Sequence, residues 1–226
     1  MTQIPVARRA AFSLLVLCIA GALGAELLKA GSEHLPGVQA STAATTQADA
    51  LSREPIQPIP EQPLLSPLKV ELGERLFRDR RISRNGSVAC ATCHNLELAA
   101  VDRLPLSRRD NGELTEFNTP TLFNVSLNFR LFWNGRARRL EEQLEHPRDT
   151  GTVWKDVLEK LRNDSEYAPR FARAYPEGMT VNTLQDALLT FERSLITPNA
   201  RFDRYLRGDR TAITREEEAG YFLFKQ

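Results

Sequence analysis

Five consecutive residues constrain this chain more than any other part of it: Cys90-Ala91-Thr92-Cys93-His94. On a helix the two thiols and the imidazole stand at positions i, i+3 and i+4, which share one face. Thiols in this arrangement can add to the two vinyl groups of a haem while the imidazole binds its iron, and the spacing is the sequence pattern of c-type haem attachment. We therefore predict one haem c bound covalently to Cys90 and Cys93, with His94 as an axial iron ligand.

Other uses of a Cys-x-x-Cys pair fit the sequence less well. A structural zinc site takes four protein ligands, and outside the motif the sequence holds only Cys18, His34 and His146 as further cysteine and histidine residues. A thioredoxin-like redox pair belongs in a βαβ pattern, which we do not find. A haem-free structural module is the remaining alternative.

The charge balance excludes one class of partner. Thirty Lys and Arg residues stand against 29 Asp and Glu, for a formal net charge of +1. A protein that binds nucleic acid by neutralising phosphates carries an excess of positive charge, so we expect no nucleic-acid partner. With 42% apolar and 26% charged residues, the chain has the composition of a folded globular protein.

The first 66 residues predict export and a linker. Arg8 and Arg9 precede an uncharged, mostly apolar run over residues 10–25, which is typical of a signal peptide, with an uncleaved membrane anchor as the alternative. We assign residues 1–25 to this segment and residues 26–66 to a Pro-, Ala- and Thr-rich linker. Since c-type haem is assembled outside the cytoplasm, we expect a periplasmic protein, either free or tethered to the inner membrane.

Apolar spacing predicts helices in the remainder. Ser66 can cap a helix that begins at Pro67, and amphipathic patterns follow over residues 153–161 and 181–195. No period-two run of similar length competes, so the expected fold class is all-α. Residues 102–139 are rich in Asn, Gly and Arg with interspersed aromatics, which predicts a long ordered loop packed on a large flat partner such as haem.

Two further features of a haem pocket can be sought in the sequence. Arg136 and Arg81 are candidates to pair with the negatively charged haem propionates. The sixth iron position has Met179, His146 and His34 as its candidate ligands. A strong sixth ligand would favour a mono-haem electron carrier or sensor, whereas an open position suits peroxide chemistry.

Several further segments between about Pro67 and Gln226 form a pattern with the haem motif. In chain order they are Leu72-Gly73-Glu74-Arg75-Leu76-Phe77, the motif at Cys90–His94, Asn118-Thr119-Pro120-Thr121-Leu122-Phe123-Asn124, Phe132-Trp133-Asn134-Gly135-Arg136-Ala137, Leu140-Glu141-Glu142-Gln143, and Phe191-Glu192-Arg193-Ser194-Leu195-Ile196-Thr197-Pro198. In sequence and in order these segments resemble the bacterial di-haem cytochrome c peroxidases and their MauG-type relatives.

The resemblance implies two cytochrome c-like domains in a complete protein. Residues 67–210 would be the first, with additional helices, and residues 211–226 the start of a truncated second. The first haem would reduce hydrogen peroxide, using electrons that the second haem takes from a small cytochrome c or cupredoxin. A homodimer is a further implication. MauG-like oxidation of a protein or organic substrate is the alternative activity.

Individual site residues follow from the resemblance. Trp133 is similar to a tryptophan that carries electrons between the two haems, although it could be an ordinary core residue. Asn118 matches an asparagine that helps to bind calcium, a cation that prefers oxygen ligands; a turn residue is the alternative.

The sequence departs from the family pattern in three places. A displaceable distal histidine would stand near Asp110, but residues 95–145 contain no His, which predicts an iron that needs no reductive activation. Asp149 occupies the region of the glutamate that assists O–O cleavage; a helix-capping role is its alternative. The second Cys-x-x-Cys-His is absent from this sequence.

Overall fold

The structure is a computed structural model that describes residues 53–61, 63–145 and 147–226. The signal segment, most of the linker, Cys18, His34 and His146 lie outside these residues. Within them the chain is helical, and its extended pairing is limited to two isolated bridges, Arg108 with Leu114 and Leu131 with Ala137. The predicted all-α class is confirmed.

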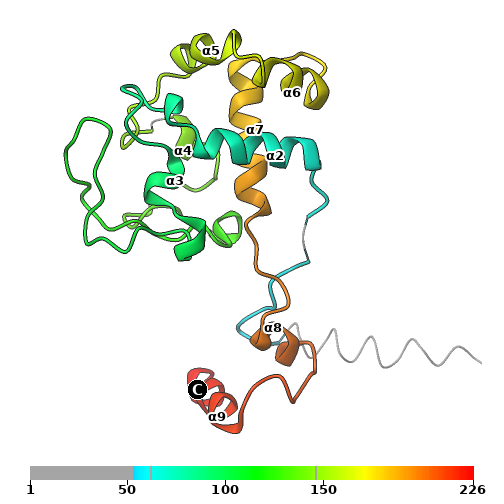
Figure 1. Cartoon of the computed structure of the whole chain (residues 1–226). Coiled ribbons are helices and arrows are strands. Elements are labelled where there is room, and N and C mark those ends of the chain that lie inside the picture. The colour runs from blue at the N-terminus through cyan, green and yellow to red at the C-terminus, as the bar shows by residue number, and fades with distance from the viewer. Residues whose placement is uncertain (1–52, 62, 146) are drawn as a thin grey trace, which may run out of the picture. The chain divides into compact units, whose positions relative to one another are not determined.

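Eight α-helices and three 3-10 turns make up the described chain (Figure 1). They are α2 (Pro67–Arg78), η1 (Arg80–Ile82), α3 (Cys90–Cys93), η2 (Leu96–Leu98), η3 (Val125–Leu127), α4 (Glu142–Glu145), α5 (Trp154–Arg162), α6 (Tyr167–Ala174), α7 (Val181–Ser194), α8 (Arg201–Leu206) and α9 (Arg215–Phe224). None of the helices in the described ranges is long and apolar enough to cross a membrane.

Helix α2 begins at Pro67, as the sequence predicts, but without the expected side-chain cap. Pro67 occupies the first turn of α2, where its missing N–H costs nothing. Ser66 holds the N-cap position, yet its side chain makes no capping hydrogen bond, so the predicted cap is wrong. Proline therefore marks this helix start without help from the preceding hydroxyl.

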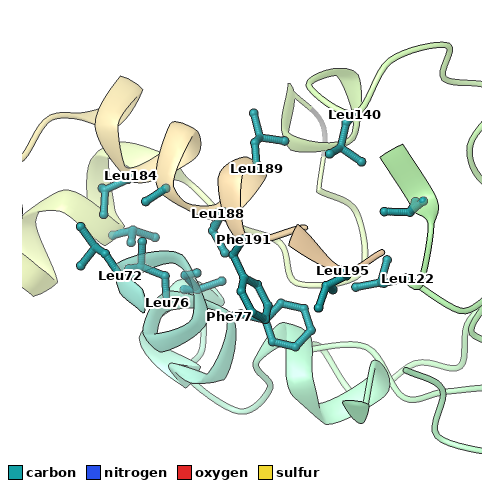
Figure 2. Close-up of a cluster of buried hydrophobic side chains, with 14 of the residues drawn as sticks. Leu72, Leu76, Phe77, Leu122, Leu140, Leu184, Leu188, Leu189, Phe191 and Leu195 are labelled. Atoms are coloured by element: carbon teal, nitrogen blue, oxygen red, sulfur yellow. The ribbon is translucent and has the colours of Figure 1, made fainter. Parts of the chain in front are cut away.

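The core forms where α2 crosses α7 (Figure 1). Phe77 of α2 packs on Phe191 of α7 with ring centroids 5.1 Å apart, and leucines from both helices surround this pair, as Figure 2 shows. The helices approach closely at Gly73, where an added Cβ would lie 2.0 Å from the carbonyl oxygen of Ala187. Glycine is required here because no side chain fits between the two backbones.

A second, smaller cluster joins the last two helices. It consists of Tyr205, Leu206, Ala212 and Tyr221, with Ile56, Phe202 and Ile213 packed against it. The backbone N–H of Ile59 donates to Asp203 at 2.8 Å, and the Tyr221 hydroxyl donates to Glu54. Part of the predicted linker is thus bound to α8 and α9.

Candidate haem site

Both cysteines of the motif lie on α3 and face one cavity. The helix starts with the Ala89 N–H donating to the Thr92 hydroxyl at 2.9 Å, and it ends as the His94 N–H donates to the Cys90 carbonyl at 2.9 Å. Cys90 and Cys93 are both free thiols. They line a cavity of about 450 Å³ together with His94, so the three groups that the sequence singles out meet in one space.

The His94 imidazole is held by backbone carbonyls. Its Nδ1 lies 3.2 Å from the Ala100 oxygen, and because a carbonyl can only accept, Nδ1 carries the proton and Nε2 is left as the metal-binding nitrogen. Burial lowers the pKa of His94, while hydrogen bonds to Ala100 and Pro120 oppose the shift. The ring is therefore neutral at pH 7, which is the form that binds a metal.

The two thiols are stabilised in their protonated form. Burial raises the pKa of Cys90 to about 12, and the nearby charge of Glu192 adds to the effect. Burial also raises the pKa of Cys93, although a hydrogen bond with Ser107 opposes it. Ser107 is buried and bonded to Asp102 at 2.6 Å and to Thr119 at 2.5 Å, so its hydroxyl is fixed beside the Cys93 sulfur.

The walls of this cavity suit a porphyrin. They are formed by apolar side chains from α2, η3, α5, α7 and the loops, among them Phe77, Val88, Leu122, Val125, Leu131, Phe132, Trp154 and Leu188. In the described part of the chain, no group of three or more His, Cys, Asp or Glu residues could hold a bare metal ion. The donor set of two thiols and one imidazole in an apolar cavity therefore fits haem c.

Asp149 reaches the same cavity from the loop that precedes α5. Its carboxylate accepts from Arg109 Nε at 2.9 Å, and 53% of its side chain is exposed. Its carbonyl accepts from the Asp110 N–H at 2.9 Å. Asp149 thus stands at the cavity edge, oriented by one arginine.

Asp110, which lies near the expected position of a distal histidine, binds backbone and side-chain groups of the loop before α3. Its carboxylate accepts from the backbone N–H groups of Asn85 and Ser87, at 2.7 and 3.2 Å, and from the Ser87 hydroxyl at 2.6 Å. Asp110 is not among the residues that line the cavity. This carboxylate holds the loop that leads into α3.

Trp133 and Asn118 are brought together at the cavity mouth. The indole Nε1 of Trp133 donates to the backbone carbonyl of Asn118 at 2.9 Å, and both residues line the cavity. Phe132 and Gly135 have φ values of 62° and 65°, which close a tight turn around Trp133. The indole is 61% exposed, so Trp133 is not a core residue.

The two candidate arginines lie in different places. Arg136 lines the haem cavity, and its guanidinium stacks 3.4 Å from the centre of the Phe132 ring. No ion pair involves Arg136 within the described ranges. Arg81 instead binds Asp79 at 2.7 Å and Asp164 at 2.8 Å, and it is not among the cavity-lining residues.

One pair in the cavity was not singled out from the sequence. The side-chain Nε2 of Gln143 in α4 donates a hydrogen bond to the carboxylate of Glu192 in α7, and both residues line the cavity. Glu192 is only 5% exposed. Met179, the candidate sixth ligand within the described residues, packs against the main core instead of lining the cavity.

Comparison with known proteins shows which family the chain belongs to. A sequence profile described as di-haem cytochrome c peroxidase matches residues 67–211. The chain belongs to the di-haem cytochrome c peroxidase family. Within it, the chain is 37% identical over 177 residues to the cytochrome c peroxidase Ccp of Escherichia coli, covering 76% of this chain and 38% of that protein. It is also 37% identical over 209 residues to the MauG protein of Methylorubrum extorquens, covering 83% and 57% of the two chains.

Solved structures of this family share the fold. A MauG-like protein associated with microbial copper homeostasis superposes with a TM-score of 0.64 at 29% identity, over 76% of this chain and 53% of that one. The diheme peroxidase BthA of Burkholderia thailandensis gives a TM-score of 0.57 at 25% identity, over 72% and 47%. The present sequence spans between 38% and 57% of the length of four curated relatives that it matches.

Proposed function

We propose that this chain carries the peroxide-reacting haem of a di-haem cytochrome c peroxidase. The observation that supports it most directly is that Cys90, Cys93 and His94 line one apolar cavity, with Asp149 at its edge. Cys90 and Cys93 would hold the haem and His94 Nε2 would bind the iron. When bound, the group supplies a redox-active iron that can take two oxidising equivalents from hydrogen peroxide.

Asp149 is the proposed acid/base of the site. Its carboxylate would accept a proton from one peroxide oxygen and return it to the other as the O–O bond breaks. Arg109 orients this carboxylate through the contact at 2.9 Å. Asp149 is shorter than the glutamate of the family pattern, and its position at the cavity edge, with half of its side chain exposed, keeps it open to solvent protons.

Peroxide mixing tests the proposal. In stopped-flow measurements on the haem-loaded chain, we expect hydrogen peroxide to convert the ferric spectrum to that of an oxidised species. Asp149→Asn should slow this step by about 10² to 10⁴-fold, the usual contribution of a positioned acid or base. Asp156→Asn, an exposed aspartate on α5, is the matched control and should react at the wild-type rate. A ferric spectrum that persists in the wild type would refute the peroxidatic role.

Arg136 is the proposed partner of a haem propionate. Removing its positive charge in Arg136→Ala should lower the haem reduction potential, because a nearby cation disfavours the ferric state. We expect a shift of up to about 60 mV, which is a tenfold change in a one-electron equilibrium. Arg81→Ala should leave the potential unchanged, since Arg81 pairs with Asp79 and Asp164 outside the cavity. Equal shifts in the two variants, measured by redox titration, would argue against the assignment.

The remaining parts of the proposal rest on the family and on the N-terminal sequence. We propose export to the periplasm, one haem c in this chain, a second haem in the complete protein, and a small cytochrome c or cupredoxin as the electron donor. Trp133 is the proposed electron route, and its exposure of 61% suits an indole that faces another redox group. A calcium site near Asn118 and a homodimer are proposals that follow from the resemblance alone.

A second candidate is oxidation of a protein or organic substrate, as in the MauG branch. The exposed indole of Trp133 favours it, because an electron hole that reaches Trp133 arrives at the surface of the described chain. Mass spectrometry of a partner protein after peroxide treatment separates the two activities: a modified tryptophan or tyrosine supports substrate oxidation, and oxidation of a donor cytochrome alone supports the peroxidase.

A further inference from the structure

Glu192 is a buried acid that the proposed mechanism does not use. It stands on α7 within a stripe of apolar residues that includes Leu188 and Leu195, and it is 5% exposed. A carboxyl group in such a place is costly unless it is hydrogen-bonded. Its side-chain partner is Gln143, which donates from Nε2. Both residues face the haem cavity, so this pair belongs to the wall of the site.

The groups around Glu192 do not offset the cost of burying its negative charge. The hydrogen bond from Gln143 and the charge of Arg193 both lower the pKa of Glu192, but the Arg193 guanidinium is directed to Glu141. On α3 the titratable neighbour of Glu192 is the Cys90 thiol, and on α4 its neighbour is the uncharged side-chain amide of Gln143. Burial dominates and raises the pKa of Glu192 to about 7. The carboxyl is therefore neutral in acid and charged above neutrality.

The chemistry of the two side chains makes their pairing directional. An ionised carboxylate can only accept, so Gln143 must turn its NH2 group to Glu192 and its oxygen elsewhere. A protonated carboxyl can donate, and it allows the amide to turn over so that its oxygen faces Glu192. Resting on the proposed haem function, we propose that Glu192 is a positioning residue that fixes the Gln143 amide and so sets whether this part of the cavity wall offers a donor or an acceptor.

The test is a pH titration of the ferric haem spectrum between pH 5 and 9. Wild type should show a one-proton step near pH 7, and Glu192→Gln should lack it. Glu145→Gln changes an exposed acid on the same helix as Gln143 and should retain the step. Gln143→Leu removes the amide through which Glu192 acts, so its step should be reduced at least several-fold in amplitude.

Each contrary result has a distinct meaning. A full step in Glu192→Gln assigns the titration to another group and overturns the inference. A full step in Gln143→Leu means that Glu192 acts by charge alone, which also overturns the positioning role. Absence of haem from the wild type, measured as its pyridine haemochrome, refutes the proposed function itself, and the inference with it. Equal haem content in all variants shows that a lost step does not come from a misfolded chain.

Discussion

Replacing Cys90 and Cys93 together by alanine is expected to abolish covalent haem attachment. The two thiols line the cavity that His94 shares, and no other cysteine lies in the described part of the chain. His94 alone could hold haem only reversibly, so acid–acetone extraction should remove all colour from the double variant and none from the wild type. Each single variant should keep one thioether bond and a shifted haemochrome spectrum.

Cys18→Ala is the matched control for this experiment. Cys18 stands in the predicted signal segment, outside the motif, and its replacement should leave haem content unchanged. If the wild type, expressed in a strain that matures c-type cytochromes, is colourless and both motif thiols react with an alkylating agent, the haem assignment is wrong. The retained colour of Cys18→Ala separates loss of attachment from a general effect of removing cysteine.

Gly73→Ala is expected to destabilise the fold severely. The added Cβ would lie 2.0 Å from the Ala187 oxygen and 2.6 Å from the Phe191 Cβ, so α2 and α7 would have to move apart along the core. Overpacking usually costs about 1 to 3 kcal/mol, and a clash with helix backbone belongs at the upper end of that range or beyond it. Urea unfolding of the haem-loaded chain, followed by circular dichroism, measures the loss.

Gly220→Ala provides the comparison for Gly73. Gly220 is also helical, in α9, but a Cβ added there meets nothing within 4 Å. Alanine is the better helix former by about 1 kcal/mol, so this variant should unfold at the wild-type urea concentration or above it. Equal destabilisation by both substitutions would contradict the idea that close helix approach makes Gly73 necessary.

The haem motif and the longer helices could be predicted from the sequence because their signals are local. The spacing of Cys90, Cys93 and His94 is a property of five residues, and α7 follows from apolar residues at helical intervals. The start of α9 is local in the same way, since Thr214 and Glu217 form a reciprocal capping box. In each case the residues that determine the structure are neighbours in the chain.

The features that were missed depend on contacts between distant segments. The helix α6 contains Pro169, which interrupts a helical pattern, and burial of Tyr167 and Phe171 holds it. Its one local signal is Asp164, whose carboxylate accepts from the N–H groups of Glu166 and Tyr167. The pairing of Gln143 with Glu192 joins residues 49 positions apart. One signal was available: an acid within the apolar stripe of α7 indicates a buried carboxyl that needs a partner.

The burial of the Cys90 thiol has a consequence for the order in which the protein is made. Thioether formation requires a reactive sulfur, and the raised pKa of Cys90 keeps this sulfur in its protonated, less reactive form. In a chain that reached its final packing first, the Cys90 thiol would thus be buried and protonated before it could react with haem. We therefore expect the prosthetic group to be attached before the chain reaches its final packing.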